Sequence, residues 1–318
     1  MEALMSMAAR LRRAAVNCVA VLCLPIAVHA QAVVPAPVNT LDRRVLETVM
    51  GRSGALLAGD VLRFGMPRSD LDVRIGDVRV RPTLALGSWL AFKAVPGGAL
   101  AMGDLVLLES ELDPVLARLQ AGGIEQSAIH HHLVGESPHV LYVHLHGHGD
   151  ARHIAEVVRA ALALTATPVP TPVPVPTTAT AFTLDSAAIG NTIGFHGAVN
   201  GGVLQIGVPR AETIREMGVE IPPSMGLATA INFQPTGDGK AAITGDFVLL
   251  AAEVNPVIRV LQSQGIAVTS LHNHLLDDEP RLFFVHFWAN DDALKLARGL
   301  RAALDVTNSR RAIERAVR

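Results

Sequence analysis

The sequence contains very little cysteine. Only two of its 318 residues are cysteines, Cys18 and Cys23, and both lie close to the N-terminus. If that segment is removed from the mature protein, the remaining chain has neither a disulfide nor a thiolate ligand. Any metal that the mature chain binds must therefore be held by nitrogen and oxygen atoms.

Charged and aromatic residues are also scarce. Charged residues make up 18% of the chain, aromatic residues make up 4%, and the formal net charge is -2. Because lysine and arginine are thinly spread, there is no basic stripe to neutralise phosphates, so we expect no nucleic-acid partner. A cluster of arginines at the C-terminus is expected to be a solvated helical end, and it comprises Arg310, Arg311, Arg315 and Arg318.

The N-terminal apolar stretch is too short to span a membrane comfortably. It covers residues 14–28, follows three arginines and ends in a small-x-small sequence before Gln31. This pattern is typical of a secretory signal peptide, so we predict that residues 1–30 are cleaved and that the protein is periplasmic or secreted, without a membrane span. Lipid attachment at Cys23 is the competing interpretation, but Ala20-Val21-Leu22 is a poor lipobox.

The sequence is internally duplicated. With a shift of 142 positions, residues 103–162 match residues 245–304 at 25 of 60 positions, which is far beyond compositional chance. The similarity extends back to Gly59–Arg68 and Gly201–Arg210. Half of the residues are apolar, which is enough for two units with cores of their own.

A stretch rich in proline, threonine and valine separates the two copies. Residues 165–181 alternate proline with small residues, a pattern that favours an extended polyproline spacer and cannot form a core element. We therefore predict a first repeat domain at residues 39–164 and a second at residues 182–308.

Each copy is predicted to fold as an α+β unit. Glycine turns separate alternating strands, and each copy then continues as strand, helix, strand, strand and helix. Asp113-Pro114 and Asn255-Pro256 are typical helix starts, because a capping side chain precedes a proline that needs no N–H at the first helical position. The order predicts two tandem repeats, each an antiparallel sheet with helices packed on one face.

Three histidines recur at equivalent positions of the two copies. They are His130, His132 and His144 in the first copy and His272, His274 and His286 in the second. Alternate residues of a strand share a face, so His130 and His132 should project together, while Ile129 and Leu133 point into the core. A hairpin would bring His144 beside them. Three neighbouring imidazoles predict a Zn, Cu or Fe site in each copy.

The competing interpretation is that these histidines are hydrogen-bonded surface residues of a sheet. Histidines without a counterpart in the second copy are weaker candidates, and these are His131, His139, His146, His148 and His153. Glu111 and Glu253, which are equivalent, are candidate catalytic residues. Each is either an acidic residue near a helix N-terminus or, if it reaches the histidines, a fourth ligand or general base.

Several motifs resemble the LppY/LpqO family of exported bacterial proteins, a domain of unknown function. The second copy carries Gly245-Asp246-Phe247-Val248-Leu249, Glu253-Val254-Asn255-Pro256, Leu271-His272-Asn273-His274 and Pro280 to His286, and the first carries His144-Leu145-His146-Gly147-His148-Gly149. The sequence departs from the family pattern at His131 and at Ala289-Asn290-Asp291. The resemblance implies export and two repeats, and it names no reaction.

Two functional classes follow from the sequence. The first is an exported protein that binds a divalent transition metal, with a hydrolase or an oxidase as the enzymatic form. Because a ligating imidazole must be neutral, this class predicts that metal binding weakens below about pH 6.5. The second is a metal-free module that binds an envelope or small-molecule ligand, for which Tyr142, Phe284 and Trp288 provide stacking surfaces.

Overall fold

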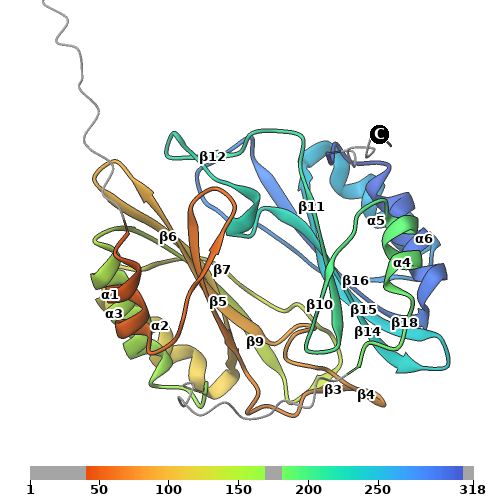
Figure 1. The fold of residues 1–318 in the computed structure, drawn as a ribbon, viewed down its shortest axis with the longest axis horizontal. Helices are drawn as coiled ribbons and strands as arrows, with labels where there is room; N and C mark the ends of the chain where they lie inside the picture. The colour runs from red at the N-terminus through yellow and green to blue at the C-terminus, as the bar shows by residue number, and fades with distance from the viewer. Residues whose placement is uncertain (1–40, 169–180, 311–318) are drawn as a thin grey trace, which may run out of the picture. The chain divides into compact units, whose positions relative to one another are not determined.

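A computed structural model describes residues 41–168 and 181–310 (Figure 1). The predicted signal peptide at residues 1–30 and most of the predicted spacer at residues 165–181 lie outside these ranges. The same holds for most of the C-terminal arginine cluster. Among the described residues, no helix is both long enough and apolar enough to cross a bilayer.

The two repeats build six-stranded antiparallel sheets with the same strand order. In the first sheet the strands lie in the order β1 (Ala55–Leu57), β2 (Val61–Pro67), β5 (Gly87–Val95), β6 (Gly98–Leu108), β9 (Val140–Gly149) and β7 (Glu125–His130). In the second they lie in the order β10 (Ala198–Asn200), β11 (Val203–Pro209), β14 (Ala228–Gly237), β15 (Lys240–Leu250), β18 (Leu282–Asp292) and β16 (Ala267–His272). The duplication seen in the sequence is therefore a duplication of topology.

Three helices accompany each sheet, and Figure 1 shows them on one side of it. The first set is α1 (Arg43–Met50), α2 (Glu109–Ala121) and α3 (Ala151–Leu162), and the second is α4 (Ser186–Ile193), α5 (Ala251–Ser263) and α6 (Ala293–Leu304). Alternate residues of a strand face the helices, so Leu105 and Leu107 of β6 join the same buried cluster as Val115 and Leu119 of α2. The predicted α+β fold with helices on one face is confirmed.

Short strands extend each repeat beside its histidine loop. The first repeat has β3 (Arg74–Ile75), β4 (Val78–Arg79) and β8 (Glu136–Ser137), and the second has β12 (Arg215–Glu216), β13 (Val219–Glu220), β17 (Asp278–Glu279) and the 3₁₀ turn η1 (Pro223–Met225). In both repeats the third strand follows the histidine strand directly. These small sheets fix the loops that carry His132 and His274.

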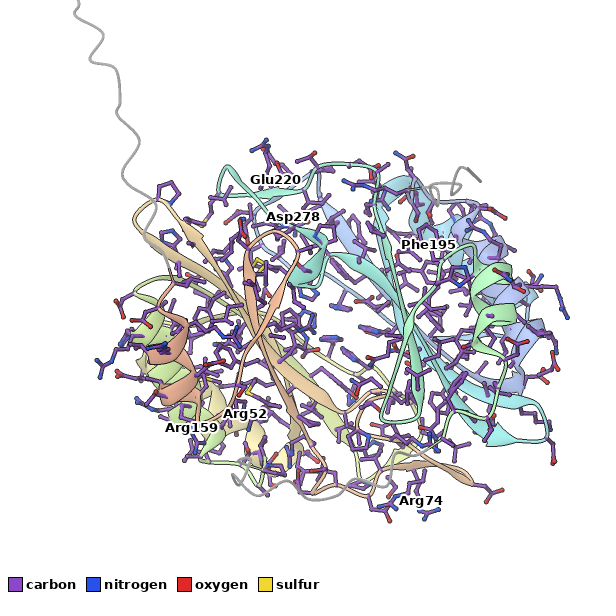
Figure 2. The ribbon with its side chains drawn as sticks, viewed as in Figure 1. Arg52, Arg74, Arg159, Phe195, Glu220 and Asp278 are labelled. Carbon is purple, nitrogen blue, oxygen red and sulfur yellow. The ribbon has the colours of Figure 1, made fainter. Side chains whose placement is uncertain are left out.

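The other faces of the two sheets meet each other. One buried cluster joins Trp89 and Leu100 of the first repeat to Met225 and Leu275 of the second, so the repeats share a core in addition to their own cores. Figure 2 shows side chains of both sheets in the space between them. The described residues accordingly fall within one compact unit. The two repeats therefore bury one face of each sheet against the other.

The predicted helix starts at the prolines are wrong. Helix α2 begins at Glu109, so Pro114 lies inside it, and Pro256 lies inside α5 in the same way. The earlier start is stabilised by Glu111, whose carboxylate accepts a hydrogen bond of 2.9 Å from the backbone N–H of Leu108. A carboxylate in the first turn satisfies a free N–H and favours the positive end of the helix dipole.

Candidate metal centre

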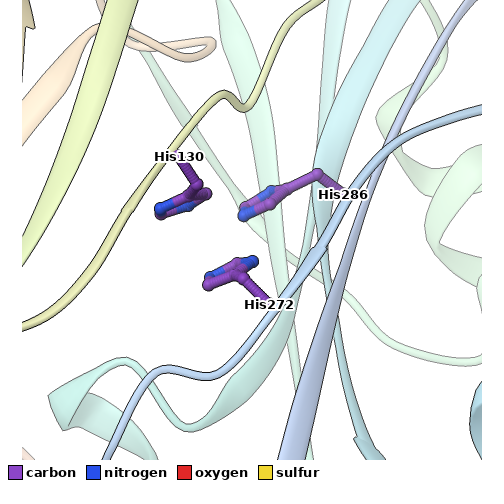
Figure 3. A group of neighbouring side chains, drawn as sticks. All are labelled: His130, His272 and His286. Atoms are coloured by element: carbon purple, nitrogen blue, oxygen red, sulfur yellow. The ribbon is translucent and has the colours of Figure 1, made fainter.

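All six repeated histidines converge where the two sheets meet. His130 ends β7 and His144 lies in β9, while His272 ends β16 and His286 lies in β18. Because β7 pairs with β9 with Ala128 opposite His144, the predicted hairpin neighbourhood of His130 and His144 is present. Figure 3 shows His130, His272 and His286 pointing toward one another from strands of both repeats.

Ring-to-ring contacts across the repeats are reciprocal. The ring centroids of His132 and His286 lie 3.8 Å apart, and those of the equivalent residues His274 and His144 also lie 3.8 Å apart. Reciprocal contacts of this kind are expected when two similar units face each other about an approximate two-fold axis. The two predicted histidine sets therefore lie in a single cluster to which both repeats contribute.

Three overlapping groups of histidines place their ligand atoms within 4.8 Å of one another. The groups are His130-His132-His144, His130-His272-His286 and His144-His272-His274. The first is the set that the sequence predicts for repeat one. The predicted set of repeat two does not form a group of its own among the described residues, since its members join histidines of repeat one instead.

Most of the nitrogens in this cluster are buried without a hydrogen-bond partner among the described residues. They are both ring nitrogens of His130, His144, His272 and His274, together with Nε2 of His132 and of His286. A buried polar atom without a partner costs about 1–3 kcal/mol. So many unpaired nitrogens at one point fit a group of metal ligands, because coordination satisfies the lone pairs that water no longer reaches.

One histidine has its tautomer fixed by the fold. Nδ1 of His286 lies 2.9 Å from the backbone carbonyl oxygen of Gly245. A carbonyl oxygen only accepts, so Nδ1 carries the proton and the lone pair of Nε2 points into the cluster. This second contact is the one that typically orients a metal-binding imidazole.

The environment favours the neutral form of five of the six imidazoles. Burial, helped by the charges of nearby histidines and opposed by Asp104, lowers the pKa of His130 from 6.5 to about 2. Burial likewise lowers the pKa of His286 to about 3, and it moves the pKa values of His132, His272 and His274 well below the ordinary range. Neutral imidazole is the form that donates a lone pair to a metal.

Two aspartates beside the cluster were not identified from the sequence. Oδ2 of Asp104 lies 3.6 Å from Nε2 of both His132 and His144. Asp246, its equivalent, places Oδ1 3.9 Å from Nε2 of His286, and burial together with the charge of Asp104 raises the pKa of Asp246 well above its usual value. The sequence carried a signal that could have identified them, because a Gly-Asp pair occurs at the equivalent strand position of both copies.

Glu111 and Glu253, the candidate catalytic residues, have other partners. Glu111 forms hydrogen bonds of 2.7 and 3.1 Å with the buried guanidinium of Arg68, and Glu253 makes the same two contacts with Arg210. Neither glutamate belongs to any of the histidine groups. Their contacts indicate a structural role in joining the helix start to strand β2 or β11, through an arginine that both copies carry after Gly-x-Pro.

The histidines without a repeat counterpart lie outside the three groups. Nδ1 of His131 lies 3.3 Å from the carbonyl oxygen of Val140, and Asn273 donates to the equivalent carbonyl of Leu282. The difference between His131 and Asn273 is thus a change of side chain at an equivalent contact of the two repeats. His139 contacts Glu136, His146 contacts Glu216 and Glu125, and His153 contacts the carbonyl oxygen of Gly122. His148 has no such contact among the described residues.

The opposite face of the histidine strand is less buried than its sequence predicts. Leu133 and Leu275 are buried as expected, but Ile129 is 49% exposed and Leu271 is 50% exposed. Strands β7 and β16 lie at the edges of their sheets. The helices cover the central strands, so apolar residues of an edge strand extend beyond them.

A cavity of about 760 Å³ lies beside the cluster. The residues that line it include His132, His144, His274, His286, Asp104 and Trp89. Tyr142 stacks on His132 with ring centroids 3.4 Å apart, and Phe284 lies 4.7 Å from His274. The cavity can therefore bring a small molecule next to the histidine nitrogens.

Comparison with known proteins gives a family without an assigned activity. Neither the search of curated proteins nor the search of solved structures gave a match. The family described as Domain of Unknown Function (DUF1259) matches residues 44–164 and residues 187–306, which are the two repeats. The chain therefore belongs to this family and contains two tandem copies of its domain.

Proposed function

We propose that this protein binds one divalent transition-metal ion in the histidine cluster that its two repeats share. The observation that carries the proposal is the convergence of buried ring nitrogens that have no hydrogen-bond partner among the described residues, contributed by equivalent strands of both repeats. Nitrogen ligands favour Zn, Cu or Fe, and the described part of the chain contains no cysteine to add a thiolate.

The proposed stoichiometry follows from how the three histidine groups overlap. His130, His144 and His272 each belong to two of the groups, so that any two groups share one histidine. A neutral imidazole has one lone pair and binds one metal. Filling one group therefore removes a ligand from each of the others, which supports one ion per chain.

The group His130-His272-His286 is our preferred site. It is the one that contains His286, whose Nε2 is oriented by the hydrogen bond from Nδ1 to Gly245. A site with three protein ligands leaves a coordination position for water or for a bound molecule. His286 is the member of this group that lines the adjoining cavity, so a molecule in the cavity would approach the ion from the side of His286.

The alternative function is a metal-free module for an envelope or small-molecule ligand. The cavity and the ring of Trp89, which lines it, favour this alternative, because they provide apolar surface whether or not a metal is present. Elemental analysis of purified protein after dialysis separates the two functions. One equivalent of Zn, Cu or Fe per chain supports the metal proposal, and a metal-free protein that cannot be reloaded contradicts it.

We also propose that the protein is exported and belongs to the LppY/LpqO group of bacterial proteins. The arginines and the apolar stretch of residues 1–30 support export, and the motifs around the repeated histidines support the group. Mass spectrometry of protein recovered from a bacterial host tests the export proposal. A mature N-terminus at Gln31 is expected, and an intact N-terminus in the cytoplasmic fraction would contradict it.

A further inference from the structure

One end of the cavity carries an arginine without a carboxylate partner. Arg63 is partly buried and lies over Trp89, with its guanidinium carbon 4.1 Å from the ring centroid. Its one hydrogen bond is a long contact of 3.4 Å to the carbonyl oxygen of Ser224. It forms no ion pair with any residue in the ranges that the structure describes. Burial lowers its pKa to about 10, and the charge of Asp104, which also lines the cavity, opposes this fall without forming an ion pair.

The two arginines whose side chains are fully buried, Arg68 and Arg210, are paired with carboxylates. Arg68 contacts Asp70 and Glu111, and Arg210 contacts Glu212 and Glu253, at distances of 2.7–3.2 Å. A buried charge is expensive unless it is paired. Arg63 lacks the carboxylate partners that both of these arginines have, and an anion that enters the cavity would supply one.

The second repeat does not repeat this cation. Gln205 is the equivalent of Arg63, because each lies five residues before the paired arginine of its repeat. Nε2 of Gln205 donates a hydrogen bond of 2.8 Å to the carbonyl oxygen of Thr83, which leaves that end of the cavity neutral. The equivalent of Trp89 is Ala230, since the two pair with Asp104 and Asp246 in their sheets.

The charged end is next to the histidine cluster. The rings of Trp89 and His274 are stacked with centroids 6.4 Å apart. Gly226 touches both, since a Cβ atom there would lie 2.9 Å from Trp89 and 3.4 Å from Nε2 of His274. A small molecule held by Arg63 would therefore extend past Trp89 to the histidine nitrogens.

We propose that Arg63 binds the oxyanion, a carboxylate or a phosphate, of a small molecule that occupies this cavity. Guanidinium suits this ligand because its donors match two oxygens of a carboxylate or phosphate. That the rest of the molecule reaches a metal rests on the proposed function. The contact with Arg63 does not depend on it, since that side chain lines the cavity in the chain alone.

The test compares Arg63→Gln, which installs the residue of the second repeat, with wild type. Binding of benzoate, its neutral isostere benzamide and inorganic phosphate is measured by calorimetry on the full chain, both metal-loaded and after chelation. We expect benzoate or phosphate to bind wild type about tenfold or more tightly than the variant, which corresponds to one charge-assisted contact. Benzamide should bind wild type and variant alike.

Two further variants keep the outcome interpretable. Arg118→Gln removes an exposed arginine of α2 and should leave anion binding unchanged, and Arg63→Lys should retain part of it because the charge remains. Unchanged oxyanion affinity in Arg63→Gln, or no oxyanion binding to wild type, would overturn the proposal. Metal content is measured separately. If the wild type holds no metal and Arg63→Gln still weakens benzoate binding, the metal proposal is refuted and the Arg63 proposal stands.

Discussion

His130 and His272, which are equivalent residues of the two repeats, stack on each other with ring centroids 3.7 Å apart. Equivalent residues can meet in this way only if the two repeats face each other about an axis that passes between them. The shared cluster is therefore a product of how the repeats pack, and its chemistry depends on both.

Metal stoichiometry gives the first prediction. Because the three histidine groups overlap pairwise, we expect one metal ion per chain after reloading with excess zinc and dialysis. Elemental analysis normalised to protein concentration measures the ratio. Two tightly held ions per chain would contradict the shared site and would favour a separate site in each repeat.

Substitution of one ligand of the preferred site should weaken metal binding strongly. His272→Ala is expected to weaken it by more than the roughly 10–100-fold that loss of a contact to a ligand costs. In a shared site the metal content falls from one ion toward none, whereas independent sites would leave half of the original content. His153→Ala is the matched control, because His153 lies on α3 outside all three histidine groups. Equal metal content in the two variants would refute the assignment.

Asp104 should matter without being a ligand in any of the histidine groups. Its charge acts on His130 of the preferred site, where it favours positive charge on the imidazole, and its carboxylate lies 3.6 Å from nitrogens of His132 and His144. We expect Asp104→Asn to weaken metal binding about 10–100-fold. A competition titration with a chromophoric chelator measures the change, and the exposed Asp113→Asn should leave the affinity at its wild-type value.

Stability of the metal-free protein should fall in acid. The folded state holds the pKa of His130 near 2 and that of His286 near 3, whereas both are about 6.5 in the unfolded chain. Below pH 6.5 the unfolded chain therefore binds more protons, and the free energy of unfolding decreases by at most about 1.4 kcal/mol per pH unit for each such histidine. Urea unfolding at pH 7 and pH 5, after chelation, measures this loss.

The same lowered pKa values change the expected pH dependence of metal binding. Protons compete for these nitrogens only well below pH 6.5, so metal should stay bound at pH 5.5, where an ordinary histidine site already weakens.

A variant tests the stability prediction for the metal-free protein. In His130→Gln, the free energy of unfolding should decrease less steeply as the pH falls. An unchanged slope in that variant would show that His130 titrates normally.

Glu111 should be needed for stability and not for metal binding. Glu111→Ala leaves the buried guanidinium of Arg68 with Asp70 as its one carboxylate, and loss of a buried ion-pair partner costs about 3–5 kcal/mol. Denaturant unfolding measures the change, and the exposed Glu109→Ala should stay within about 0.5 kcal/mol of wild type. Full stability with loss of metal would restore Glu111 as a site residue.

The sequence by itself determined the duplication, the α+β class and the strands that carry the histidines. Repetition and period-two alternation are local properties, so they could be recognised without a structure. Local signals misplaced the start of α2, because the capping carboxylate of Glu111 outweighed the Asp113-Pro114 pattern. They also assigned Ile129 to the core, because alternation does not reveal which strand lies at an edge.

Only the tertiary structure decided that the two histidine sets form one cluster. Packing of the two sheet faces depends on apolar residues far apart in the chain, such as Trp89 and Met225, and no local periodicity encodes their contact. The pairing of Arg68 with Glu111 and the stacking of Arg63 on Trp89 were also decided by the tertiary structure, because these side chains meet only after the chain has folded.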